Sequence, residues 1–331
     1  MAATVRNAPS RTPPLRVIPC GRFRLTLRGG PLVMGIVNVT PDSFSDGGRF
    51  VGPAEAVRHA QRLVDEGADL IDVGGESTRP GAAPVEVEEE ARRVVPVIRA
   101  LAKRLAVPVS VDTSKAAVAQ RAIDAGASLV NDVTALRGDP QMAQIVAKAR
   151  VSVILMHRRG TPQTMQQAPR YQDVVGEVQR FLAQASRRAQ GAGIRSDRIL
   201  LDPGLGFGKT VRHNLLLLRH LDALAALGQP VVIGPSRKSF IGRVVAPPAR
   251  RDTSSPERTL PARSLDAEVS QRLNGTLACV AYAMRQGAAM VRVHDVKATV
   301  QFIRMWNAIE DASPHLFVGR RPAQHVVTPG R

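Results

Sequence analysis

The sequence predicts a (β/α)8 TIM barrel that forms a single α/β domain. Eight short apolar runs recur along the chain, and eight amphipathic segments alternate with them. The runs are nearly continuous and rich in β-branched residues, as expected for parallel strands that are buried on both faces. Strands that alternate with helices form βαβ units, and eight such units are the number that closes a barrel.

The predicted strands are all short. They are LVMGIVN (32–38), LIDVGG (70–75), VPVSVDT (107–113), SLVNDV (128–133), SVILMH (152–157), ILLDPG (199–204), PVVIGP (230–235) and MVRVHD (290–295). A chain of 331 residues, 44% of them hydrophobic, is long enough to bury the core of one such barrel.

The predicted helices lie between these runs. They span 54–66, 87–105, 114–125, 139–148, 173–190, 214–227, 267–286 and 297–309. Several end in Gly before the next strand, as in DEGADLI and RQGAAMV, and Gly supplies the left-handed turn that closes a helix. A doubly wound open sheet is the alternative, but it usually carries a Gly-rich turn after its first strand, where this chain has Asn38-Val39-Thr40.

Composition predicts the domain limits. We expect residues 1–20 to be a basic, Pro-containing N-terminal extension that is disordered, and 21–312 to form the barrel. Residues 246–266 are rich in Pro, Ser and Arg, which predicts a long loop inserted between the seventh strand and its helix. The tail 313–331 is expected to be loose.

The formal net charge of +18 raises the question of a nucleic-acid partner. The arginines are scattered over the predicted helices, often beside Glu or Asp, and aromatic residues that would stack on bases make up only 3% of the chain. We therefore expect no nucleic-acid partner, and a positive field that suits small anionic substrates.

The two cysteines, Cys20 and Cys279, form no disulfide framework and no metal pattern. The first twenty residues lack the apolar segment of a secretory signal, and no run of about 18 apolar residues predicts a membrane span. These observations predict a cytoplasmic protein with reduced cysteines and no membrane contact.

Polar side chains follow every predicted strand, at the point where the strand ends. Because the carboxyl ends of barrel strands converge on one mouth, these side chains should meet there. They are Asn38, the segment 76–80, Asp112, Asn131 with Asp132, His157, Asp202, the segment 236–238, and Arg292 with His294 and Asp295.

Asp112, Asn131 and Asp202 form one chemical group. Two carboxylates and an amide in an apolar cup suit a flat heterocycle with exocyclic amines, because a carboxylate accepts two parallel N–H bonds in a fork geometry. For Asp112 an alternative stays open, since DTSKAAVAQ also resembles a helix start in which Asp112 or Thr113 is the N-cap. No helix start follows Asp202.

Arg79, Lys238, Arg292 and His294 form a second, cationic group, together with Ser77, Thr78 and Asn38. Guanidinium forks and hydroxyl groups are what a pyrophosphate requires. A Mg2+ ion that bridges phosphate oxygens needs only one or two protein oxygens, and Asn38 is a candidate. No cluster in the sequence demands a transition metal.

Three loops border the predicted mouth. NVTPDSFSDGGRF (38–50), which carries Phe44, and GGESTRPGAAPV (74–85) are long enough to fold over the mouth and exclude water. DPGLGFGK (202–209) lacks the spacing of a Walker A motif, and we interpret it as a rigid wall that presents Phe207.

These motifs together resemble the dihydropteroate synthases. The resemblance covers residues 31–310 and rests, in chain order, on MGIVNVTPDSFSDGG, DVGGESTRPGA, VSVDTSK, LVNDV, LMH, LDPGLGFGK, GPSRKSFIG and RVHDV. It implies a (β/α)8 barrel, usually a homodimer and a target of sulfonamides. It also implies a transferase of folate biosynthesis that joins 6-hydroxymethyl-7,8-dihydropterin diphosphate to p-aminobenzoate and releases diphosphate.

The resemblance also implies a role for each matching residue. The pterin would be held by Asp112, Asn131, Asp202 and Lys238, near Val133 and Met156. The diphosphate would be held by Asn38, Thr78, Arg79, Arg292 and His294, with Mg2+ beside Asn38. The aminobenzoate would be bordered by Phe207, Pro80, Lys238 and Ser239, with Arg237 stacked over the ring from outside and Phe44 contributed by the first loop.

Two other functions are compatible with parts of the pattern. A pterin-dependent methyltransferase on a similar barrel would share the carboxylates but would not need Arg79, Arg292 or the loop 38–50. A non-catalytic pterin-binding paralogue should have lost some of these residues, and none is missing from the sequence.

Overall fold

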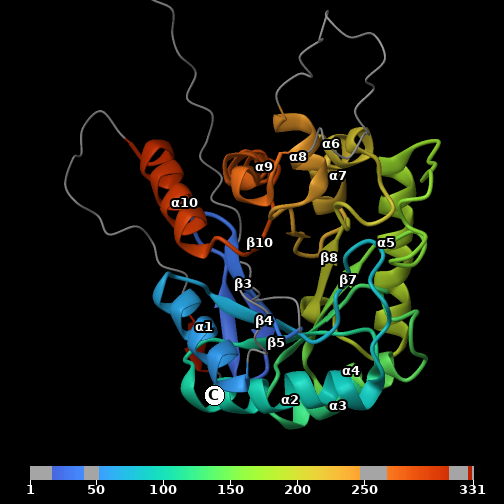
Figure 1. Cartoon of the computed structure of the whole chain (residues 1–331), viewed down its shortest axis with the longest axis vertical. Helices are drawn as coiled ribbons and strands as arrows, with labels where there is room; N and C mark the ends of the chain where they lie inside the picture. Colours follow the sequence, from blue (N-terminus) through green and yellow to red (C-terminus); the bar gives the residue numbers. More distant parts are fainter. Residues whose placement is uncertain (1–16, 41–51, 247–266, 313–326, 330–331) are drawn as a thin grey trace, which may run out of the picture.

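Eight parallel strands close into a barrel, and helices form a layer around it (Figure 1). The structure is a computed structural model that describes residues 17–40, 52–246, 267–312 and 327–329. The barrel strands are β3 (Leu32–Asn38), β4 (Leu70–Gly74), β5 (Val109–Asp112), β6 (Leu129–Asp132), β7 (Ser152–Met156), β8 (Ile199–Asp202), β9 (Val232–Ile233) and β10 (Met290–Val293).

The strand order is β8-β7-β6-β5-β4-β3-β10-β9, and a parallel bridge between Leu201 and Val231 joins the two ends of this sheet. Each strand pairs in parallel with its neighbours, as the alternation of apolar runs with helical segments predicted. The predicted (β/α)8 barrel is confirmed.

The helices match the predicted segments, with three differences, of which the first is an additional helix over 239–245 that is not among the predicted segments. They are α1 (Pro53–Asp65), α2 (Val87–Arg104), α3 (Ala116–Asp124), α4 (Met142–Ala149), α5 (Val174–Gly191), α6 (Val211–Arg219), α7 (Leu221–Ala225), α8 (Ser239–Val245), α9 (Leu273–Arg285) and α10 (Val296–Glu310). The helix predicted over 214–227 is two helices, because the backbone of His220 leaves the helical conformation (φ −116°, ψ 39°). The helix predicted over 267–286 begins with a 3-10 turn, η3 (Val269–Arg272).

Side chains that point inward from alternate strand positions fill the end of the barrel opposite the mouth, which we call the lower end. Leu32, Leu70, Leu129, Leu200 and Met290 are all fully buried in one cluster. They lie at or next to the first residue of their strands, so the end of the barrel opposite the mouth is a packed core rather than a pore.

A small antiparallel sheet closes this lower end. It consists of β1 (Val17–Cys20), β2 (Phe23–Thr26) and β11 (Val327–Pro329). Ile18 and Leu25 are buried in the same cluster as the first residues of the barrel strands. The predicted extension 1–20 is therefore wrong for Val17–Cys20, and the predicted loose tail is wrong for Val327–Pro329, since both segments pair with β2.

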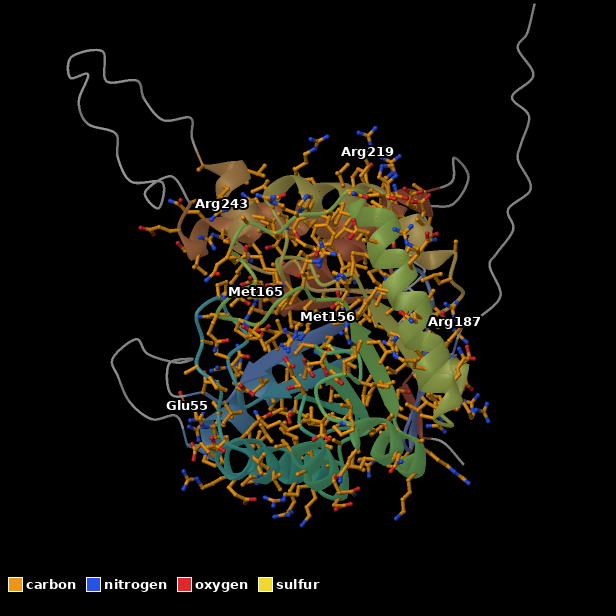
Figure 2. The ribbon with its side chains drawn as sticks, turned by 90° about the vertical axis from the view of Figure 1, so that its right-hand side faces the viewer. Glu55, Met156, Met165, Arg187, Arg219 and Arg243 are labelled. Atoms are coloured by element: carbon orange, nitrogen blue, oxygen red, sulfur yellow. The ribbon has the colours of Figure 1, made fainter. Side chains whose placement is uncertain are left out.

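The remaining predictions about the chain ends and the inserted loop concern residues 1–16, 247–266, 313–326 and 330–331. These lie outside the described residues, as does 41–51 in the first predicted loop. Exposed arginines such as Arg187 on α5 and Arg219 on α6 project from the outer helices (Figure 2). Among the described helices, none combines the length and the apolar character needed to cross a membrane.

Candidate active site

The register of four neighbouring strands brings polar side chains together at the mouth. Asn38 of β3 pairs with Gly74 of β4, Gly74 with Asp112 of β5, and Asp112 with Asn131 of β6. Gly74 has no side chain, and a Cβ there would lie 3.7 Å from Asp112 Oδ2 and 3.8 Å from Asn38 Oδ1. The glycine thus leaves a space flanked by two oxygen atoms.

Asp112 points into the mouth and does not cap a helix. Its Oδ2 accepts a hydrogen bond of 2.7 Å from Arg292 Nη2. Helix α3 begins at Ala116, and the N–H of Ala116 donates a hydrogen bond of 3.0 Å to Asp139 Oδ2 instead of to Asp112. The alternative that Asp112 is an N-cap is therefore wrong. Burial raises the pKa of Asp112 to about 7, although Arg292 opposes the shift.

Asp72 is a mouth residue that was not predicted. This β4 residue is fully buried, and its Oδ2 accepts hydrogen bonds from Arg292 Nε at 2.6 Å and from Asn131 Nδ2 at 3.0 Å. Its Oδ1 has no hydrogen-bond partner among the described residues. The signal in the sequence was an acid inside an otherwise apolar strand, which is costly unless the acid is paired.

Asp202 lies across the barrel from this group, at the end of β8. Its Oδ1 accepts a 2.6 Å hydrogen bond from the N–H of Gly204. Burial raises its pKa, and Lys238 is the largest opposing influence. Met156 is its register partner on β7, and Val133, directly after β6, is buried as well. The predicted ring-holding residues Asp112, Asn131, Met156 and Asp202 thus come from the ends of four consecutive strands, β5 to β8.

Lys238 lies against the wall formed by residues 203–209. Its ammonium donates to the carbonyl oxygen of Leu205 and lies 4.5 Å from the centre of the Phe207 ring. Burial lowers its pKa to about 8, although Asp202 attracts the charge. The side-chain stem runs over Gly206, where a Cβ would approach Lys238 Cδ to 3.0 Å.

The wall is rigid because its glycines pack on backbone. Gly204 and Gly208 have φ of +67° and +63°, and a Cβ on either would lie within 2.3 Å of a carbonyl oxygen of the β7–α5 loop. Lys209, which is buried, donates to Phe207 O at 3.0 Å and lies 3.0 Å from His157 Nδ1. Burial lowers the pKa of Lys209 well below its usual value. The prediction of a Gly-rich wall that presents Phe207 agrees with this packing.

His294 differs from its predicted charge state. Burial, Arg292 and Arg237 lower its pKa to about 3, so the imidazole is neutral and not cationic. Ser236 Oγ accepts from the backbone N–H of His294 at 3.1 Å and lies 3.0 Å from His294 Nδ1. The hydroxyl proton of Ser236 can be donated to Nδ1, and in that tautomer the imidazole proton lies on Nε2.

The loop after β4 carries the half-buried Thr78 and the exposed Arg79 and Pro80. A partly buried ion cluster anchors it, because the ammonium of Lys115 bonds both Glu76 of the loop and Glu90 of α2. Glu76 Oε1 also accepts from the N–H of Val85 at 3.2 Å, at the far end of the loop. The two ends of the loop are therefore tied to one carboxylate.

Two predicted residues lie at the rim. Arg237 forms an ion pair with Asp295, with Nε 2.9 Å from Asp295 Oδ2, and Ser239 is the exposed first residue of α8. Phe44 lies outside the described residues. Within the part of the chain that is described, no three His, Cys, Asp or Glu side chains form a metal cluster.

The arrangement has two chemical halves. Buried acids and an amide can accept N–H bonds from a flat ring, while Arg292 and a neutral His294 can donate to an anion beside it. Donors or acceptors left unpaired in such a site cost about 1–3 kcal/mol each, so the acids would select strongly for a matching ring.

Comparison with known proteins agrees with this chemistry. Residues 34–294 match the family model described as pterin binding enzyme. Dihydropteroate synthase of Escherichia coli is 46% identical over 278 residues, which are 84% of this chain and 91% of that protein. The Xanthomonas albilineans dihydropteroate synthase, solved with 4-aminobenzoic acid, shares 47% identity at a TM-score of 0.79 over 90% of this chain and 100% of that one.

Two further solved structures bear on the ligands. The Xanthomonas albilineans enzyme has also been solved with 7,8-dihydropteroate, at 45% identity and a TM-score of 0.76, covering 90% of this chain and all of that one. The Yersinia pestis dihydropteroate synthase, solved with a sulfonamide drug, has 45% identity and a TM-score of 0.76, covering 87% of this chain and 98% of that one.

We predict that the carboxyl group of Asp112 titrates with a midpoint of about 7. The carboxylate form should dominate above this pH and the protonated form below it. Replacing Arg292 by Ala should raise the midpoint, because the guanidinium favours the charged form. Carbon-detected NMR of the aspartate side chains measures both values, and Asp112→Asn identifies the signal. A midpoint at the ordinary value of about 3.9 would contradict the burial argument.

Proposed function

The chain belongs to the pterin binding enzyme family and, within it, to the dihydropteroate synthases, and from this premise we propose how its mouth carries out the reaction. The enzyme is a transferase of folate biosynthesis. It condenses 6-hydroxymethyl-7,8-dihydropterin diphosphate with p-aminobenzoate to give 7,8-dihydropteroate and diphosphate. The observation that carries the proposal is the meeting of buried acids and an arginine at one end of the barrel.

In the proposal, Asp112, Asn131 and Asp202 hold the pterin ring. Asp202 of β8 is buried and Asp112 of β5 is only 10% exposed, and the hydrogen bonds described above engage Oδ2 of Asp112 and Oδ1 of Asp202. A carboxylate can accept the paired N–H groups on the amino edge of the ring. Lys238 contributes a donor from the wall, while Val133 and Met156 pack against the ring faces.

Arg292, His294, Arg79 and Thr78 hold the diphosphate. A neutral His294 with its proton on Nε2 donates a hydrogen bond without requiring its own charge to be buried. Arg292 supplies a permanent charge from inside the mouth, and Arg79 supplies another from the anchored loop. These groups stabilise the negative charge that grows on the leaving group, which is the main source of catalysis in the proposal.

Magnesium beside Asn38 is part of the proposal. The space that Gly74 leaves is flanked by Asn38 Oδ1 and Asp112 Oδ2, which are the hard oxygen donors that Mg2+ prefers. In the described chain no larger cluster of metal ligands exists, so such an ion would depend on the diphosphate oxygens as well. When bound, it would neutralise charge on the diphosphate.

The reaction is a dissociative substitution at the exocyclic methylene. The C–O bond to the diphosphate breaks first, and the electron-rich dihydropterin delocalises the resulting cation. The aryl amine then forms the new C–N bond and loses a proton to solvent or to the departing diphosphate. The protein holds the ring and the anion in place, and no covalent enzyme intermediate is needed.

The second substrate binds beside the wall. Phe207 and Pro80 border the aminobenzoate, and Ser239 receives its carboxylate at the start of α8. We include Phe44 in the same proposal as a substrate-binding residue. Arg237 lies at the rim of the mouth and stacks over the substrate ring from outside. Support comes from Lys238, which already lies over Phe207 and so connects the ring half of the mouth with this half.

The cysteines and one surface patch support two further parts of the proposal. Burial raises the pKa of both free cysteines, Cys20 and Cys279, to about 12, which suits inert thiols in the cytoplasm. We infer a homodimer because exposed large apolar side chains gather on elements that pack together. They are Leu215 on α6, Val244 and Val245 on α8, Val269 on η3 and Tyr282 on α9.

The reaction is tested by measuring diphosphate release with and without p-aminobenzoate. We expect sustained release only when both substrates are present, and slower release when EDTA removes divalent ions. Asp202→Ala should weaken ring binding by about 100-fold or more, since hydrogen bonds to a charge are lost. Arg292→Ala should mainly lower kcat, by about 100-fold. Full activity of Asp202→Ala would contradict the ring assignment.

Sulfonamides should compete with p-aminobenzoate. Inhibition kinetics are expected to show a KM for p-aminobenzoate that rises with sulfonamide concentration at an unchanged kcat. Phe207→Ala should weaken both ligands, because each loses the same aromatic wall. If inhibition did not depend on the p-aminobenzoate concentration, the second pocket would be misassigned.

The homodimer predicts a mass in solution of twice one chain. Val244→Glu should shift the mass measured by light scattering toward one chain, because a buried unpaired charge opposes association. Met305→Glu is a matched control, since Met305 is 63% exposed, against 54% for Val244, but lies on α10. Dissociation by the control alone would place the interface on α10 instead.

A further inference from the structure

Arg292 bonds two carboxylates with different nitrogen atoms. Nε donates to Asp72 Oδ2 at 2.6 Å, and Nη2 donates to Asp112 Oδ2 at 2.7 Å. The side chain of Asp72 is 0% exposed, that of Asp112 is 10% exposed and that of Arg292 is 21% exposed. The guanidinium is therefore attached at a buried end through Nε and at a more open end through Nη2.

The two carboxylates stand at different depths in the barrel. On β4, Asp72 pairs in register with Ser110, and Gly74, two residues further toward the mouth, pairs with Asp112. Asp72 is thus one inward-facing layer below Asp112. It also fixes Asn131, whose amide donates to the same Oδ2 atom. Asp112 faces the ring in the proposed function, whereas Asp72 lies beneath it.

We propose that Asp72 is a pivot that holds Arg292 by Nε while the outer nitrogen atoms exchange Asp112 for the diphosphate. The proposal rests on the proposed function and deepens it. Ring N–H groups that bind Asp112 compete with Nη2 for Oδ2, which frees the outer edge of the guanidinium. The outer nitrogen atoms of Arg292 then turn toward the leaving group, while Nε stays bonded to Asp72. Asp72 is a positioning residue, since it acts through Arg292.

The charges explain why the pivot is needed. With both acids present, Arg292 is attracted to each of them, so its outer nitrogen atoms can leave Asp112 while Nε keeps a charged partner in Asp72. Without the charge of Asp72, the guanidinium would pair only with Asp112. It would then occupy the acceptor that the ring requires and stay away from the diphosphate. Asp72 therefore couples recognition of the two halves of one substrate, and such couplings are typically 5–150-fold, or about 1–3 kcal/mol.

The test compares two ligands by calorimetry: 6-hydroxymethyl-7,8-dihydropterin and its diphosphate. The ratio of their dissociation constants is the diphosphate increment. Asp72→Asn keeps the shape, and its register partner Ser110 carries a buried Oγ that has no hydrogen-bond partner among the described residues. We expect it to reduce the increment by about tenfold or more, while affinity for the ring alone changes by about threefold or less. In an Arg292→Ala background, Asp72→Asn should leave the remaining increment unchanged.

Two further variants keep the test decisive. Ser110→Ala is the matched control, because it removes a buried polar atom on the register partner of Asp72 that makes no hydrogen bond within the described part of the chain, and it should retain the full increment. Arg292→Lys keeps the charge but offers a single nitrogen, so it should lose the increment even if Asp72→Asn does not fold. A full increment in Arg292→Lys would overturn the pivot.

Two other results would also overturn it. An equal loss for both ligands in Asp72→Asn would mean that Asp72 only shapes the ring pocket, and an unchanged increment would mean that Arg292 needs no anchor. A wild-type protein that binds neither ligand would overturn the proposed function itself and the pivot with it, and this outcome is distinct because it appears before any substitution is made.

Discussion

The mouth depends on a cation of the protein that neutralises acidic side chains, because these acids lie deeper in the barrel than solvent could reach to stabilise their charge. Asp72 and Asp112 are inward-facing acids on neighbouring strands, and removing such groups from water costs several kcal/mol per ion unless they are paired. Arg292 reaches both of them from β10, on the other side of β3. The barrel can therefore keep carboxylates in a largely apolar cup, and this is what makes the cup selective for a ring with matching donors.

Most of the fold could be predicted because barrel strands are buried on both faces. Continuous apolar runs such as 32–38 and 199–204 are therefore visible without knowledge of their partners. The small lower sheet was missed for the opposite reason. Its strands are short, and β2 pairs with residues about 300 positions away, so nothing local indicates Val327–Pro329 as a partner. The break at His220 was also missed, since the apolar period continues across it.

The site could be predicted to the extent that topology alone determines it. Residues that directly follow an apolar run, such as Asp112 and Asp202, reach the mouth because all parallel strands point there. Asp72 was missed because it lies inside its run, two residues before the end of β4. The charge of His294 was predicted wrongly because it depends on Arg292, Arg237 and burial, which only the assembled barrel brings around the imidazole.

The lower sheet has a consequence for how the chain can be rearranged. Phe23 and Pro329 are direct neighbours in that sheet, so the beginning and the end of the described chain meet at the closed base of the barrel. A linker that joined Pro329 to Val17, whose strand β1 also pairs with β2, would give a circular permutant whose new ends could be opened in an outer connection elsewhere. Because the base is the pole opposite the reacting groups, a reporter attached at Val17 or at Pro329 would lie away from the mouth.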